Sequence, residues 1–283
     1  MYITKAVFTL HAEADIVIPP FSSKVTKTIL IHGLNGAGSS KLLEEIRAKT
    51  RYKSLVLSPV FSGSKPLIKL DMQNSSSLTL FRNRRYWFWV VVLGLEPALE
   101  IVDAVSSMAD SSMCLFSKPV KVSLYELTVR HMAQLGLPED TRYLGLQFIT
   151  PMLLQLPPRP HIPVKHILFP MQHLMIRSLL EHWNKYSGSE LAINDNLLPA
   201  YSFYALREVD YSVRPVTVVY DESRRPRGFI GWVMYRIWRG RKRSRYRSLL
   251  KLLDYANYVG IGRSRTMGFG IVSVSRVMAD EGR

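Results

Sequence analysis

The chain has 283 residues, which is enough for two modest domains with cores of their own. Its longest strongly apolar stretch, Tyr86–Leu95, is ten residues long, whereas a membrane-spanning helix needs about 20, so we expect no membrane contact. The N-terminal residues alternate in polarity and include acids, which excludes a signal peptide. The single cysteine, Cys114, excludes an internal disulfide and a cysteine-based zinc site. A cytoplasmic location is therefore the default expectation.

Positive charge is concentrated in one segment. The chain has 38 Lys and Arg residues against 22 Asp and Glu residues. Residues 224–247, which we call the basic block, hold ten of the basic residues and no acidic one. Because Trp and Tyr are interleaved with these cations, the block suits a polyanion whose phosphates meet cations and whose bases stack on rings. The block predicts nucleic-acid binding; a solvated basic loop is the plainer alternative.

The first half of the chain predicts the order strand, helix, strand, strand, helix, strand. The apolar and β-branched runs that predict strands lie at 2–11, 54–61, 86–93 and, in two extended pieces, within 114–132. Helical spacing is found in the segment that begins near residue 24, in 42–47 and in 96–108. The segment 136–140 is a plausible linker.

The second half repeats this order. Strands are predicted at 143–154, 213–220, 229–238 and 269–277, helices at 170–186 and 244–258, and a loop at 157–163. Two successive βαββαβ patterns indicate an α+β protein with tandem ferredoxin-like domains, which we place at 1–135 and 141–283. Such a domain leaves one sheet face open to a ligand, as in many RNA-binding modules.

A glycine-rich stretch at 27–41 invites two enzymatic interpretations, and both fail. A phosphate-binding loop needs Lys directly after its second glycine, but two serines separate Gly38 from Lys41. A hydrolase needs a G-x-S-x-G elbow, which the chain lacks. We interpret the stretch as the end of the first helix, which we expect to unravel at Gly33.

A second glycine-rich stretch lies at 259–270 and contains G-x-G, five residues and again G-x-G. It follows a predicted helix and precedes a strand, the reverse of a dinucleotide-binding loop. Its glycines would let the backbone approach a phosphate chain, with Arg263 and Arg265 supplying charge at the loop tip. A tight turn that needs positive φ would explain one or two of the four glycines.

Four segments together resemble a known family. They are GIGRSRTMGFG at 260–270, FITPM at 148–152, RSLL at 177–180 and LSPVF at 57–61. In sequence and order they are similar to segments of the CRISPR repeat-processing endoribonucleases of the RAMP superfamily. The resemblance implies tandem ferredoxin-like domains and metal-independent cleavage of repeat RNA, in which a 2′-hydroxyl attacks the adjacent phosphorus. The implied products are a 2′,3′-cyclic phosphate, or a 3′-phosphate, and a 5′-hydroxyl.

The resemblance also implies where catalysis takes place. Many family members use a histidine near the first helix, but residues 36–53 contain none, and His32 is the one candidate nearby. The chain is closer to the crenarchaeal members that lack this histidine and rely on lysines and arginines. Lys24 and Lys27 are three residues apart and so share a helix face. The catalytic candidates are Lys24, Lys27, Lys53, Arg236, Arg265 and His32.

The expected partner is CRISPR repeat RNA, as precursor and as processed guide RNA. The RNA-binding candidates come from the basic block and the second glycine-rich stretch; they are Arg224, Arg225, Arg227, Arg239, Arg241, Lys242, Arg243, Gly260, Gly262, Arg263, Gly268 and Gly270. None of the seven histidines has metal-ligand spacing, so we expect no metal ion and no cofactor.

Two other functions stay open. The missing histidine suggests a non-catalytic RNA-binding subunit of a CRISPR effector complex. A general single-stranded RNA-binding protein is the weaker alternative. A homodimer is expected by likeness to the histidine-lacking relatives.

Overall fold

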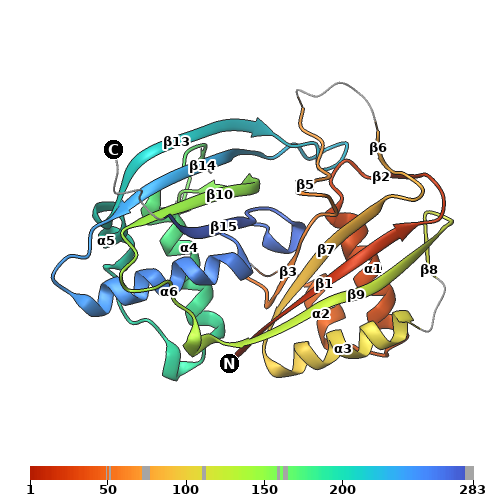
Figure 1. The fold of residues 1–283 in the computed structure, drawn as a ribbon, viewed down its shortest axis with the longest axis horizontal. Coiled ribbons are helices and arrows are strands. Elements are labelled where there is room, and N and C mark those ends of the chain that lie inside the picture. Colours follow the sequence, from red (N-terminus) through yellow and green to blue (C-terminus); the bar gives the residue numbers. More distant parts are fainter. Residues whose placement is uncertain are drawn as a thin grey trace. The chain divides into compact units, whose positions relative to one another are not determined.

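The computed structural model describes residues 1–48, 50, 52–71, 77–109, 113–157, 160–161 and 165–277. The chain divides into two compact units. Unit 1 consists of Met1–His131 together with Thr217–Pro226 and Thr266–Gly268. Unit 2 consists of Met132–Val216, Arg227–Arg265 and the residues from Phe269 onward. Each unit combines an antiparallel sheet with helices (Figure 1), which confirms the expected α+β class.

Unit 1 is built on one large sheet. Its elements are β1 (Tyr2–Ala12), β2 (Ile16–Ile18), α1 (Ser23–Gly36), α2 (Lys41–Arg47), β3 (Leu55–Leu57), β4 (Phe61–Ser62), β5 (Lys65–Pro66), β6 (Leu78–Leu80), β7 (Arg85–Leu93), α3 (Leu95–Ala109), β8 (Met113–Leu115) and β9 (Lys118–His131). The strand order is β5-β4-β7-β1-β9-β8, with β3 also paired to β7, and β2 pairs with β6 separately. The principal strands thus follow the arrangement of a ferredoxin-like βαββαβ domain.

Alternation along the central strands builds the core of unit 1. In β1 every second side chain is buried, including Phe8 and Leu10, and these pack in one cluster with residues of α1 and α3. Phe8 lies opposite Phe88 of β7, with ring centroids 5.0 Å apart in a stacked arrangement. Figure 1 shows α1 and α3 on the same face of this sheet. The period of two in the sequence therefore defines the face that the helices cover.

Unit 2 has a four-stranded sheet in the order β13-β14-β10-β15. Its elements are β10 (Tyr143–Met152), β11 (Leu154–Gln155), β12 (His166–Ile167), α4 (Gln172–Tyr186), α5 (Leu198–Ala205), β13 (Leu206–Thr217), β14 (Arg227–Ile237), α6 (Arg243–Val259) and β15 (Val272–Val277). Helices α4 and α6 pack through the buried Trp183 and Tyr255, whose rings meet edge-on at 5.0 Å. The Tyr255 hydroxyl also lies 2.8 Å from His182 Nδ1.

Two differences from the sequence-based expectations concern glycine and proline. The predicted strand 54–61 is divided into β3 and β4, since Pro59 has no N–H for a ladder and the Ser58 hydroxyl instead accepts from Trp89 N at 2.8 Å. Helix α1 does not unravel at Gly33 but continues to Gly36. Gly33 is buried against α3, and a Cβ there would lie 3.0 Å from Ala104 O. The close contact of two helices explains this glycine.

Two further differences are smaller. Helix α5 was not predicted, and the last strand begins at Val272 rather than at residue 269. Much of the predicted loop 157–163 lies outside the described residues.

Candidate active site and nucleic-acid interface

Three lysines of unit 1 form a group that we call the lysine cluster: Lys24, Lys27 and Lys53. Lys24 and Lys27 leave the first turns of α1 about 60° apart around the helix. Lys53 follows α2, and its Nζ donates to Ile46 O at 3.0 Å. The pKa of Lys53 lies below its ordinary value of 10.5, first because the side chain is half-buried and second because of the positive charge of Lys27. Lys53 therefore lies close enough to Lys27 for the charge of Lys27 to affect its pKa.

Lys24 is held by the segment that connects β13 to β14. Its Nζ lies 3.8 Å from Asp221 Oδ2 and 4.6 Å from the centroid of the Tyr220 ring. Arg224 binds the same carboxylate, with Nη2 2.5 Å from Oδ2, and lies over the same ring at 4.7 Å. The hydrogen bond from Arg224 is the main cause that lowers the pKa of Asp221 to about 2. A carboxylate that is ionised at neutral pH therefore positions Lys24.

The tip of the second glycine-rich stretch contacts the start of α1. Ser23 Oγ donates to Met267 O at 2.7 Å. A Cβ on Gly268 would lie 2.9 Å from Ser23 Cβ, so the loop backbone touches the helix here. Residues 266–268 thereby adjoin the residue that precedes Lys24.

All four glycines of this stretch are required by the packing of the protein itself. Gly260, Gly262, Gly268 and Gly270 have φ values of +68°, +85°, +82° and +70° and are buried. A Cβ would lie 2.5 Å from Gly270 O at position 260, and 2.6 Å from Leu153 O at position 262. The expectation that a tight turn would explain only one or two of these glycines is wrong. Close approach of a phosphate chain is not needed to account for them.

Arg265 points into unit 2 rather than to the surface of the loop. It is 5% exposed, and its guanidinium donates to Gly262 O and Ser178 O, both at 3.1 Å. The expectation that Arg265 supplies charge at the loop tip is wrong, because the positive-φ glycines turn the chain so that this side chain anchors the loop on α4. Arg263 is exposed and hydrogen-bonds Gln155.

His32 is separated from the lysine cluster. It is exposed on α1, about 80° around the helix and about 12 Å along it from Lys24, and about 140° around from Lys27. Arg236 belongs to unit 2, where its side chain is exposed on β14.

Acidic residues from elsewhere in the chain neutralise half of the basic block. Ion pairs join Arg224 to Asp221, Arg225 to Asp71, Arg243 and Arg247 to Glu139, and Arg245 to Asp195. The block lacks acids in sequence but not in space. Its exposed cations that form no ion pair with described residues are Arg227, Arg236, Arg239, Arg241 and Lys242.

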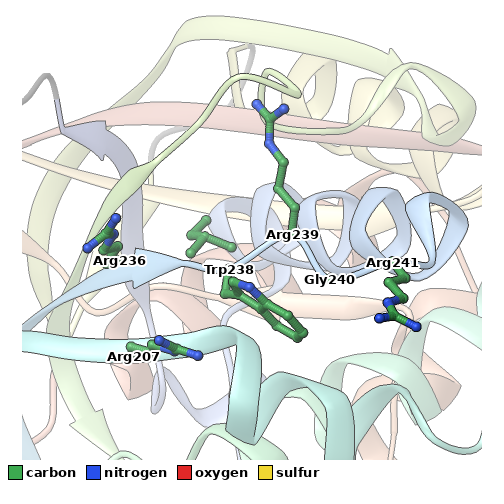
Figure 2. Close-up of a pocket in the computed structure, with 7 residues that line it drawn as sticks. Arg207, Arg236, Trp238, Arg239, Gly240 and Arg241 are labelled. Atoms are coloured by element: carbon green, nitrogen blue, oxygen red, sulfur yellow. The ribbon is translucent and has the colours of Figure 1, made fainter.

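Several of these cations surround a hollow in unit 2, which we call the arginine hollow. It has a volume of about 510 Å³ and is lined by Arg207, Arg236, Ile237, Trp238, Arg239, Gly240 and Arg241. Figure 2 shows the Trp238 indole between Arg207 and Arg236 on one side and Arg241 on the other, while Arg239 extends away from it.

The sequence-based list missed Tyr220, Asp221, Arg207 and Trp238. The only signal for Asp221 was its place three residues before the start of the basic block, and Trp238 was noted only as one of the interleaved rings. Within the described residues, no three His, Cys, Asp or Glu side chains lie together as a metal site would require. In the same part of the chain, no helix combines the length and apolar character needed to cross a membrane.

The class of protein that these observations define is one with two ferredoxin-like units, each with exposed cationic side chains. A family model described as "CRISPR-associated endoribonuclease Cas6" matches residues 146–272, and a model described as "Cas6 N-terminal domain" matches residues 4–130. The two matches together cover most of the chain, which therefore belongs to the Cas6 family. The resemblance inferred from the sequence is confirmed at this level.

Individual relatives are more distant. CRISPR-associated endoribonuclease Cas6 1 of Saccharolobus solfataricus is 34% identical over 80 residues, which are 26% of this chain and 27% of that protein. The chain thus spans about a quarter of the length of this curated relative. A Cas6 product complex matches with a TM-score of 0.70 and 16% identity, over 96% of this chain and 99% of that one. Thermus thermophilus Cas6 matches with a TM-score of 0.63 and 15% identity, over 96% of this chain and 98% of that one. A Cas6-related protein from Pyrococcus furiosus matches with a TM-score of 0.55 and 12% identity, over 98% of this chain and 99% of that one. At sequence identities this low, the similarity to these solved structures shows a shared fold only.

Proposed function

We propose that this protein cuts CRISPR repeat RNA in precursor transcripts and so releases guide RNAs in the cytoplasm. The lysine cluster supports the proposal most directly. In a chain of the Cas6 family it combines the half-exposed Lys24 and the exposed Lys27 with Lys53, whose pKa is lowered. Among proteins of similar fold, one is described as a Cas6 substrate mimic complex and another as a RAMP protein that binds different RNA substrates.

The proposed reaction needs no metal ion. The ribose 2′-oxygen forms a bond to the adjacent phosphorus while the bond from phosphorus to the 5′-oxygen of the next nucleotide breaks. A 2′,3′-cyclic phosphate and a 5′-hydroxyl result. The base takes one proton from the 2′-oxygen, and solvent water supplies one to the departing 5′-oxygen; the base then returns its proton to the solvent, so atoms and charge balance.

The three lysines have two tasks in this reaction. Lys53 is the best candidate for the base, because its lowered pKa makes the neutral amine more accessible. The ammonium groups of Lys24 and Lys27 stabilise the negative charge that grows on the phosphate oxygens and the leaving oxygen. Asp221 and Tyr220 position Lys24 without contacting the reacting atoms.

The test is cleavage of labelled repeat RNA in excess EDTA. We expect one cut within the repeat, with a cyclic phosphate end, and no cut when the nucleotide at the cleavage site carries a 2′-deoxy sugar. Cleavage of the deoxy substrate would exclude this mechanism. Replacing all three lysines of the cluster by alanine should abolish cleavage. The control replaces three exposed lysines elsewhere, Lys118, Lys121 and Lys185, which removes the same charge and should leave the rate intact.

A second candidate function is supported by the position of His32. Because His32 does not share the face of Lys24 and Lys27, no histidine of α1 lies beside the lysine cluster. A non-catalytic subunit that holds guide RNA in a CRISPR effector complex would bind the repeat tightly in the EDTA assay but leave it uncut. The same preparation, measured by sedimentation with and without RNA, tests the expected homodimer.

A further inference from the structure

The arginine hollow combines charge, an exposed ring and space. Its volume of about 510 Å³ is within the range of about 300–1,000 Å³ that small-molecule pockets occupy. Trp238 is 49% exposed, which is unusual for a side chain with so large an apolar area. The Arg207 guanidinium lies 5.8 Å from the centroid of the indole ring. An aromatic ring next to a cation suits a nucleotide, because the base can stack on the ring while the phosphate contacts the cation.

The backbone around Trp238 is held in place on both sides. Trp238 N donates to Ala205 O at 2.8 Å. The Tyr201 hydroxyl lies 3.1 Å from Trp238 O and 2.7 Å from Arg239 O, so it bridges the two carbonyls. Gly240 has a φ of +63°, and a Cβ there would lie 3.2 Å from the Tyr201 ring and 3.3 Å from the Trp238 ring. The backbone that carries the indole ring is therefore held in the free protein, which lowers the entropy lost on binding.

The cations around the hollow differ from those of the neighbouring helix. Arg207, Arg236 and Arg241 are exposed and form no ion pair with described residues. In contrast, Arg243 and Arg247 of α6 both bind Glu139. The charge of the three hollow arginines is thus available to an anionic ligand.

We propose that the arginine hollow is a subsite for one unpaired nucleotide of RNA, whose base stacks on Trp238 and whose flanking phosphates contact Arg207, Arg236 and Arg241. The nucleotide is unpaired because a base inside a duplex is already stacked on both faces and cannot meet the indole. Arg236 then binds RNA and takes no part in the chemistry. That the RNA is CRISPR repeat RNA rests on the proposed function; the preference for an unpaired nucleotide does not.

Binding measurements with an uncleavable RNA separate this subsite from catalysis. The probe is fluorescently labelled repeat RNA with a 2′-deoxy sugar at the cut site, followed by fluorescence anisotropy. Stacking of one base on an aromatic ring contributes about 1–3 kcal/mol, so Trp238→Ala should weaken binding roughly 5- to 150-fold. Trp238→Phe should recover most of the affinity. Trp232→Ala is the matched control, because Trp232 is 40% exposed on β14, the strand that ends one residue before Trp238, but does not line the hollow.

A scan with single abasic nucleotides identifies the partner of Trp238. One abasic position should weaken binding to the wild-type protein and add almost nothing to the loss in Trp238→Ala. Equal losses in Trp232→Ala and Trp238→Ala, or the absence of any coupled position, would overturn the subsite. A fully duplex RNA that binds as tightly, with the same loss in Trp238→Ala, would overturn the unpaired nucleotide. Circular dichroism melting verifies that each variant is folded.

The two proposals can fail independently. If the protein never cuts RNA but the abasic coupling is found, the subsite holds and the proposed nuclease activity does not. If repeat RNA is cut and Trp238→Ala binds it normally, the nuclease proposal holds and the subsite does not.

Discussion

Lys53 differs from its neighbours because the surrounding protein disfavours its charge. Partial burial is the larger cause of its lowered pKa, and the charge of Lys27 adds to it. A surface lysine titrates too high to act as a base near neutral pH, whereas a lysine whose pKa is lowered offers more of the neutral amine. In the proposed reaction, Lys27 therefore affects both the stabilisation of charge on the phosphate and the basicity of Lys53.

The pH dependence of cleavage tests this coupling. If neutral Lys53 is the base, the single-turnover rate should rise with pH and level off below pH 10.5, the ordinary pKa of lysine. Lys27→Gln removes a positive charge that lowers the pKa of Lys53, so that pKa rises and the midpoint of the profile moves to higher pH. The shift should be partial, because burial of Lys53 is unchanged.

The control for this experiment is Lys24→Gln. Lys24 is not among the causes of the lowered pKa of Lys53, so its loss should lower the plateau rate and leave the midpoint in place. An unchanged midpoint in Lys27→Gln would remove Lys53 as the base.

At the scale of elements, the second glycine-rich stretch contacts α1 and also allows backbone segments of unit 2 to pack closely. Gly270 has a φ of +70°, and a Cβ there would lie only 1.9 Å from Ile261 O. Gly270 N also donates to Pro151 O at 3.0 Å, and Ile261 N donates to Gly270 O at 2.8 Å. Any side chain at this position must therefore push two backbone segments apart.

Gly270→Ala should destabilise the protein by about 3 kcal/mol or more, the sum of left-handed strain and the backbone clash. Gly38→Ala is a close control, because Gly38 has a φ of +69° but a methyl group there would meet none of the described residues outside its own chain neighbours within 4 Å. That variant should lose only about 1–2 kcal/mol. Urea unfolding followed by circular dichroism measures both. Equal losses in the two variants would show that conformation alone, and not packing, requires glycine at 270.

Much of the fold was predictable because its strands are strongly patterned. Alternation along β1 and the β-branched and aromatic run of β7 identify both central strands, and helical spacing identifies α3, α4 and α6. Helix α5 was missed because the sequence LPAYSFYA is apolar on every side and gives no periodic signal. Gly33 was misread because helix propensity is local, whereas the contact with α3 that requires glycine comes from a distant segment.

The candidate site was predictable only in its local part. The spacing of Lys24 and Lys27 places them on one face without further information. The pairing of Lys24 with Asp221 joins residues almost 200 positions apart, and no local pattern encodes it. For Arg265 the local pattern was misleading. Its charge suggested a surface role, while the conformation of the glycine-rich stretch turns it inward.

At the scale of the whole molecule, the formal net charge of +16 overstates what RNA can use. Within the basic block, five of ten cations already pair with carboxylates. A cation that is paired in the free protein gains less from a phosphate, because it must first leave its carboxylate. The distribution of ion pairs, rather than the net charge, should therefore determine the electrostatic part of the affinity.

Salt dependence of RNA binding distinguishes these two views. For single-stranded RNA, each phosphate that the protein neutralises contributes about 0.7 to the slope of log Kd against log salt concentration. Replacing Arg207 and Arg241 by Gln should therefore reduce that slope by about 1.4, since neither forms an ion pair with described residues. Replacing Arg243 and Arg247 by Gln removes the same charge but releases Glu139, and the slope should change much less. Anisotropy titrations between roughly 50 and 300 mM KCl give both slopes, because the affinity for nucleic acid changes strongly with salt in this range. If the slope falls by the same amount in the two double variants, the affinity for RNA depends on the net charge alone. The arginines of the hollow would then contribute no more than other arginines.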